Sequence, residues 1–171
     1  MNKFKLGALI TASLVSTASF AASETFNASV TAAADATITN STAIDFGTVQ
    51  VASGSVCTMD AAGAVTGDCD ASAAEIALGQ VDISGLLPNT GVTVELTFSA
   101  GTNVTFVPSF DINNATTTSD GHASADGAIS VTTDGSGTDL LIDVYGQLTV
   151  NNTLTPGADE TAPYTVEVLF N

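Results

Sequence analysis

The sequence contains one histidine, His122, and this residue limits the catalytic chemistry that can be expected. It follows Ser119 and Asp120, and a Ser–His–Asp triad would depend on it entirely. No serine lies in a Gly-x-Ser-x-Gly elbow, and no glycine-rich phosphate loop with its lysine is present. A pair of carboxylates would suffice for glycoside hydrolysis. However, a sugar-binding cleft is normally lined by aromatic side chains, and the chain has only two tyrosines and no tryptophan. The sequence therefore predicts a protein that is not an enzyme.

The two cysteines, Cys57 and Cys69, form an even set, which in an oxidising compartment usually means pairing. They enclose the turn-like residues 60–63 between two short extended runs, so a disulfide would close a small hairpin. The alternative is a redox pair or metal site, but it requires CxxC spacing or nearby histidines, and neither is present. We predict a structural disulfide.

Calcium is the one small ligand suggested by residue type, and no other cofactor is expected. Hard cations prefer clustered oxygen ligands, and four aspartates fall in glycine-rich stretches: Asp120, Asp126, Asp134 and Asp139. None reproduces the Asp-x-Asp-x-Asp-Gly loop with a distal glutamate. Aspartates that favour turns and keep the surface soluble are the simpler interpretation.

The charge of the chain excludes two kinds of partner. The chain has 18 acidic and 2 basic residues and a net charge of −16; loss of Lys3 and Lys5 with a leader would make it −18. Such a chain cannot bind nucleic acid or an anionic membrane surface directly, because binding to either one requires lysine and arginine side chains. At 44% hydrophobic and 12% charged residues, it is too apolar for a disordered chain.

Residues 1–21 read as an export signal. Lys3 and Lys5 precede an apolar run over 6–15, and Ser19-Phe20-Ala21 supplies small residues at the positions a signal peptidase reads. The apolar run is too short for a membrane anchor, which needs about 20 residues. We predict cleavage after Ala21, with Ala22 as the minor alternative, and an exported, soluble protein with one domain over 22–171.

Alternation with a period of two dominates this domain and predicts strands. In the segment 26–38 every even position is apolar. Further strands are expected at 44–51, 75–83, 92–98, 104–110, 129–133, 140–150 and 164–170, separated by turns such as 87–91 and 156–157. The even positions of 92–98 are expected to face inward, and the polar stretch 113–127 to form an exposed loop. Short, regular strands of this kind predict an all-β, antiparallel β-sandwich.

Several short motifs carry a family resemblance. They are Ile44-Asp45-Phe46-Gly47-Thr48-Val49, Gly54-Ser55-Val56, Ile83-Ser84-Gly85, and the segments 92–98, 145–150 and 164–171. Together they resemble the bacterial secreted family "domain of unknown function 4402" over nearly the whole mature chain. The sequence departs from the family at 160–163, which lacks a glycine before the final tyrosine, and carries a cysteine pair not expected throughout the family. The resemblance implies an immunoglobulin-like β-sandwich in the style of fimbrial subunits, a link to chaperone–usher export, and no catalytic residues.

Fimbrial subunits of this kind resemble a sandwich that lacks one strand and receives it from a neighbour. The segment 22–38 suits such a donor strand because it is extended, alternating and near a free N-terminus; Phe26, Ala28, Val30 and Ala32 would fill the pockets. The acceptor edge would include Val166, Val168 and Phe170. The alternative is that 22–38 forms the first strand of a self-complete sandwich, because both arrangements bury the same face.

The expected function is therefore a structural subunit of a bacterial surface fibre that contributes to adhesion or biofilm. Its partners would be further copies or related subunits, a periplasmic chaperone and an outer-membrane usher, as it passes through the periplasm to a fimbria on the cell surface. The alternative is a self-contained secreted or surface β-sandwich that binds carbohydrate or divalent cations without polymerising.

Overall fold

The computed structural model describes residues 36–116, 119–135 and 139–170, all within one compact unit, Ala32–Asn171. Every ladder that joins two of the described strands is antiparallel, in accordance with the predicted class. The only helical element among these residues is the short 3₁₀ turn η1, and they contain no helix long and apolar enough to cross a membrane. The elements are β1 (Thr37–Thr42), β2 (Val56–Met59), β3 (Val65–Gly67), β4 (Gly79–Ser84), β5 (Gly91–Phe98), β6 (Val104–Asn113), β7 (Ser119–Ala123), η1 (Ser124–Asp126), β8 (Ile129–Thr132), β9 (Leu140–Val150) and β10 (Tyr164–Phe170).

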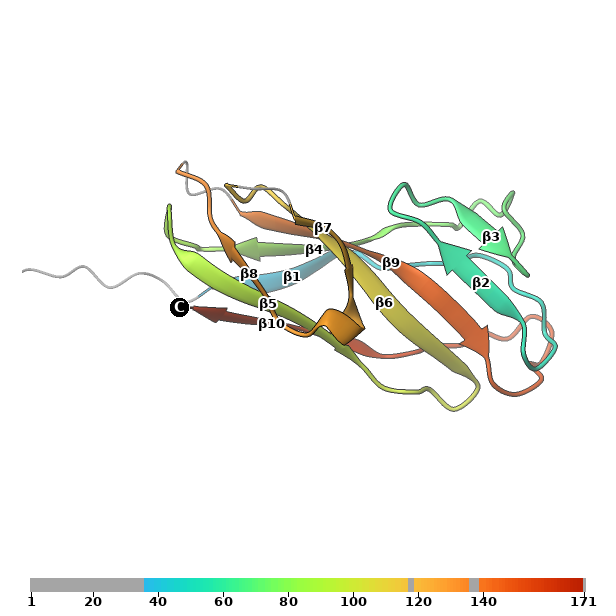
Figure 1. The fold of residues 1–171 in the computed structure, drawn as a ribbon. Coiled ribbons are helices and arrows are strands. Elements are labelled where there is room, and N and C mark those ends of the chain that lie inside the picture. Colours follow the sequence, from blue (N-terminus) through green and yellow to red (C-terminus); the bar gives the residue numbers. More distant parts are fainter. Residues whose placement is uncertain (1–35, 117–118, 136–138, 171) are drawn as a thin grey trace, which may run out of the picture. The chain divides into compact units, whose positions relative to one another are not determined.

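The larger sheet is built around β9, its longest strand (Figure 1). One edge of β9 pairs with the whole length of β6, from Val104↔Val150 to Asn113↔Leu141. Its other edge pairs first with β4 and then with β2, and the change falls between Val144 and Gly146. β1 extends the sheet beyond β4, β3 lies beyond β2, and β7 lies beyond β6.

The smaller sheet has the order β10-β5-β8 and supplies the second layer of the sandwich. The expected inward alternation of β5 is confirmed for Val92, Val94 and Leu96, which are fully buried. Phe98 belongs to the same face by alternation, but its side chain is 41% exposed. It follows the buried stretch at the end of β5, where its neighbour across the ladder is the half-buried Tyr164.

The core lies between the two sheets and confirms the β-sandwich. β4 and β6 bury every second residue, and β9 does so except at the partly buried Leu148, as the alternating sequence predicts for strands with one face against a second layer. The largest buried side chains are those of Phe106, Phe110, Met59, Ile83, Leu96, Ile112, Leu140 and Ile142.

Three segments differ from the sequence-based expectation. The stretch 113–127 is not a plain exposed loop, because it contains β7 and η1. β7 forms because its backbone pairs with the edge of β6, and this pairing does not depend on apolar side chains in β7. Gly121 adopts a φ of +75° at the point where the register of the β6–β7 ladder shifts. The stretch 44–51 forms isolated bridges rather than a continuous strand, and the strand expected at 75–83 begins at Gly79.

Candidate functional site: an open side of the sandwich

One side of the sandwich is closed by its own chain. Ala115, which follows β6, bridges to Thr133 after β8, and Thr116 donates its backbone N–H to the carbonyl of Thr132 at 2.8 Å. The turn η1 then connects β7, the edge of the large sheet, to β8, the edge of the small one. On this side, therefore, chain segments cross between the two layers and cover the core.

The opposite side is bordered by β10 and is only half covered. Val166 and Val168 lie directly across the ladder from Leu96 and Val94 and point to the same inner face. The β5 residues are at most 1% exposed, whereas both valines of β10 are only half-buried. Phe170 is 54% exposed although its partner Val92 is fully buried. Among the residues that the structure describes, none covers the inner face of β10 as fully as the inner face of β5 is covered.

The facing edge strand, β1, shows the same pattern. Ile38 is 45% exposed, although its ladder partner Ile83 in β4 is fully buried. Asn40 is exposed as well, next to the buried Val81. We call the space between β1 and β10 the open side. Among the described residues, β10 pairs only with β5 and β1 only with β4.

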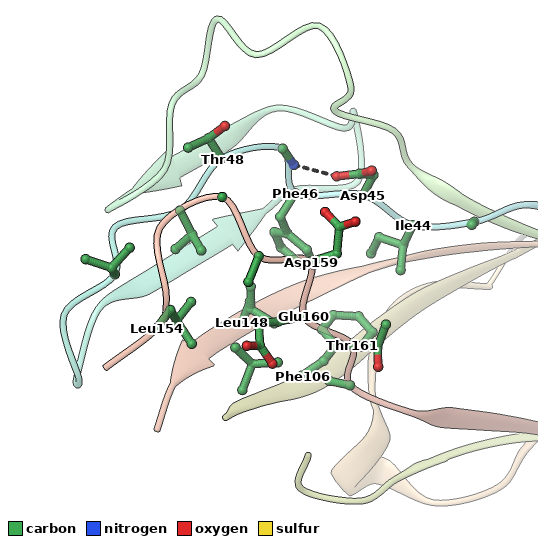
Figure 2. A pocket seen from close by; sticks show the side chains of 18 of the residues that line it. Ile44, Asp45, Phe46, Thr48, Phe106, Leu148, Leu154, Asp159, Glu160 and Thr161 are labelled. Atoms are coloured by element: carbon green, nitrogen blue, oxygen red, sulfur yellow. Dashed lines mark hydrogen bonds between the residues drawn. The ribbon is translucent and has the colours of Figure 1, made fainter. Parts of the chain in front are cut away.

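The open side ends in a cavity of about 700 Å³ beside the start of β10 (Figure 2). Figure 2 shows Phe46, Leu148 and Leu154 pointing toward this space from three separate segments of the chain. One wall is the segment 43–51 and the other is the segment 154–162, and the strands β6 and β9 supply the apolar floor.

The disulfide hairpin holds the first wall in place. Cys57 and Cys69 are bonded, as predicted, with their Cα atoms 5.4 Å apart, and β2 and β3 form the expected hairpin. Cys69 bridges to Val49 in the wall. On either side of this bridge, the N–H of Gln50 donates to the carbonyl of Asp68 at 2.8 Å, and the N–H of Asp70 donates to that of Thr48 at 2.9 Å.

Gly47 adds a second constraint on this wall. Its φ is +66°, and a Cβ at this position would lie 2.7 Å from that of Ala73. Only glycine fits such a backbone without strain. The Phe-Gly pair of the sequence motif is thereby explained: Phe46 faces the cavity and Gly47 turns the chain behind it.

The second wall is tied down at both ends. The N–H of Leu154 donates to the carbonyl of Val51 at 2.8 Å, and Asn103 donates its side-chain amide to both carboxylate oxygens of Glu160 at 3.0 Å. Asp159 and Glu160 line the cavity together with Asp45 of the first wall. The cavity therefore joins an apolar floor to acidic walls.

A line of aromatic rings runs through the floor toward β10. Phe46 meets Phe106 with ring centroids 5.6 Å apart, and Phe106 meets Tyr164 at 5.7 Å, both edge to face. Burial raises the pKa of Tyr164 above its usual value. Edge-to-face contacts are the favoured packing of aromatic side chains, so the floor is suited to extending the line with one more large apolar group.

The predicted site residues fall in several places. Phe26, Ala28, Val30 and Ala32 lie outside the described residues, while the end of the candidate donor segment, Thr37 and Ile38, starts β1. Val166, Val168 and Phe170 come together along β10 at the open side. The cavity residues Phe106, Leu148 and Leu154 were not predicted; the family motif contains Phe46 and Leu148, but nothing local identifies them as neighbours.

The four calcium candidates are spread over the strand ends. Asp120 lies on β7, Asp126 in η1, Asp134 after β8 and Asp139 before β9. The carboxylate of Asp126 accepts the N–H of Ala123 at 2.8 Å, which is a local turn interaction. Within the described ranges, no three His, Cys, Asp or Glu residues are grouped to hold a metal ion.

His122 lies on β7 and pairs with Ser119. Its Nε2 is 2.6 Å from the Ser119 Oγ, and its ring packs against Phe110 with centroids 5.5 Å apart. Neither residue of this pair lines the cavity. The contact with Phe110 and the ladder with β6 account for its position as a strand residue at the closed side.

No protein-family model matches the chain, and comparison with curated proteins finds no match.

Proposed function

We propose that this protein is a non-enzymatic structural subunit of a bacterial surface fibre, and that its open side accepts an extended strand from another subunit. The observation that carries this proposal is the half-covered inner face of β10 beside the fully buried Val92, Val94 and Leu96 of β5. An extended segment laid along β10 would pair with the backbone edge that no described strand occupies, and would cover Val166, Val168 and Phe170.

The occupant we infer is the N-terminal segment 22–36 of a neighbouring copy. From Phe26 onward its even positions are all apolar, and the segment is longer than the seven residues of β10. β1 begins at Thr37, which pairs with Ser84 at the end of β4. The short loop after Ser84 leads to the start of β5, where Val92 pairs with Phe170. The segment therefore leaves its own subunit at the Phe170 end of the open side.

The point of departure sets the geometry of the assembly. A donor strand antiparallel to β10 of the next subunit would enter from that subunit's cavity end. Each contact then joins the Phe170 end of one subunit to the cavity end of the next. Such a head-to-tail contact does not close on two subunits and generates a linear chain.

An uncovered apolar edge of this kind is an aggregation hazard until it is filled. A periplasmic chaperone and an outer-membrane usher would protect and deliver the exported subunit, as the family resemblance implies. The finished fibre would then serve adhesion or biofilm formation at the cell surface.

The proposal is tested by deleting residues 22–33 from the exported chain and imaging material sheared from cells. We expect fibres from the wild-type chain and none from the deletion, while the truncated subunit stays folded. On the acceptor side, Val166→Asp should stop assembly, and Thr165→Asp, on the outer face of the same strand, is the matched control. Fibres of normal length from the deletion or from Val166→Asp would contradict the proposal.

A further inference from the structure

The cavity beside the start of β10 has the size of a small-molecule site. Its volume of about 700 Å³ falls within the roughly 300–1,000 Å³ that is usual for such sites. Both walls are held by bonds of the chain itself. In the second wall, the N–H of Ala158 also donates to the carbonyl of Thr155 at 3.1 Å, and Gly157 turns the segment with a φ of +77°. The cavity is therefore formed by the fold and does not need a ligand to shape it.

The floor favours an aromatic group. Phe46 and Phe106 are 7% and 2% exposed, so packing holds their rings in place. Phe106 meets both Phe46 and Tyr164 edge to face. Tyr164 and Leu148 are only partly buried, which leaves apolar surface open to the cavity. An aromatic ring placed there would repeat the edge-to-face contact and remove this surface from water.

The walls carry negative charge that the domain does not neutralise. Asp45, Asp159 and Glu160 line the cavity (Figure 2). Glu160 accepts only the neutral amide of Asn103, and no described residue donates a hydrogen bond to the carboxylate of Asp159. Residues 36–170 contain no lysine or arginine. A cleft lined by charges of one sign attracts counter-ions, so the walls favour a cation.

The arrangement of these carboxylates favours an ammonium group over a metal ion. Hard metal ions require several oxygen ligands grouped around one point. In the part of the chain that the structure describes, no three acidic, histidine or cysteine residues form such a group. A protonated amine has three donors and needs no enclosing cage, so it can pair with one carboxylate at the edge of the cavity.

We propose that the cavity binds a small arylalkyl ammonium ion, in which a short chain joins an aromatic ring to a protonated amine. The ring would extend the line of Phe46, Phe106 and Tyr164, and the ammonium group would pair with Asp159 on the second wall. A neutral aromatic molecule would gain only the floor, an aromatic anion would be repelled by the walls, and an alkylamine would gain only the walls. The inference goes beyond the proposed function and rests on the cavity alone.

The test measures the binding of tryptamine to the purified full chain by fluorescence. The chain has no tryptophan, so indole emission reports the ligand alone. We expect the emission to move to shorter wavelength and to saturate as the indole enters the apolar floor. Tryptophol keeps the ring but not the charge and should bind about three- to fivefold more weakly, and indole-3-propionate should not bind measurably. Butylamine keeps the charge but not the ring and should compete only at about tenfold higher concentration or more.

The substitution Asp159→Asn locates the ammonium group. It should weaken tryptamine binding by about three- to fivefold and leave tryptophol binding unchanged. The matched control is Asp139→Asn, which removes the same charge at the opposite end of β9 from Leu148 and should leave both affinities unchanged. Asp159 and Asp139 are both exposed, so both variants should keep the wild-type melting temperature.

Four results would overturn the inference. They are an emission spectrum that tryptamine binding does not change, equal affinity for tryptamine and tryptophol, equal competition by butylamine, and equal loss in Asp159→Asn and Asp139→Asn. Binding that appears only at protein concentrations where the chain associates would assign the cavity to a contact between copies, and would overturn it too. Because the assay uses no fibres, its failure leaves the proposed function standing, and a chain that forms no fibres can still bind tryptamine.

Discussion

Removal of the Cys57–Cys69 disulfide by the double substitution Cys57→Ala/Cys69→Ala is the change whose size the structure fixes best. The two residues are 12 positions apart, and closing a loop of this size contributes about 3 kcal/mol on the chain-entropy model. Loss of the disulfide should also destabilise the cavity wall outside the hairpin, because Cys69 forms a β-bridge with Val49 in that wall.

Urea unfolding followed by circular dichroism measures this loss. With a slope of roughly 1–3 kcal/mol per molar urea, a loss of about 3 kcal/mol moves the midpoint down by roughly 1–3 M. The wild-type chain in reductant is the control for packing, because reduction opens the loop without removing either side chain. The two samples should lose similar stability.

If the double variant and the reduced wild type both unfold at the wild-type midpoint, the disulfide does not contribute the expected stability. That result would mean that the ladders between β2, β3 and β9 hold the hairpin without the bond. A loss in the double variant alone would assign the effect to the packing of Cys57, which is fully buried, and not to the cross-link.

Three further predictions follow from the fold. Burial, and then the hydrogen bond to Asp111 at 2.8 Å, raise the pKa of Tyr145 to about 12, so stability present below pH 10 should fall between pH 10 and 12. Because Tyr145 is partly exposed, we expect at most about 1 kcal/mol, absent in Tyr145→Phe and read from melting curves. Gly146→Ala should cost at least about 2 kcal/mol in urea titrations, because φ is +135° and a Cβ would collide with the carbonyl of Val107; an unchanged midpoint contradicts this. Melting temperatures should rise from low salt to seawater strength, because screening relieves the repulsion of a chain with 18 acidic residues; a flat profile would argue against it.

Strand positions were largely predictable because alternation is a local signal. The bounds of β9 and β10 match the expected 140–150 and 164–170, where one face is apolar over the whole strand. β7 was missed because its residues, Ser-Asp-Gly-His-Ala, show no such alternation. Its strand character comes from pairing with β6, which only the tertiary fold supplies.

The open side was predictable only in part. The alternating Val166, Val168 and Phe170 mark an edge that prefers to be buried, but their partial exposure depends on the order of strands in the smaller sheet. The cavity depends on still more distant relations. Phe46, Phe106, Leu148 and Leu154 are separated by up to 108 positions, and no pattern within a single strand brings them together.

β1 begins at the same end of the sandwich at which β10 finishes, and this arrangement can be used in protein engineering. If residues 22–36 were moved from the front of the chain to follow β10 through a short turn, they would run back along β10 in the antiparallel direction. The rearranged chain would carry no free strand to give and no vacant edge to receive one. A chain that simply lacks the segment would still receive a strand but give none, and added in small amounts it would act as a terminator that sets the length of a growing polymer.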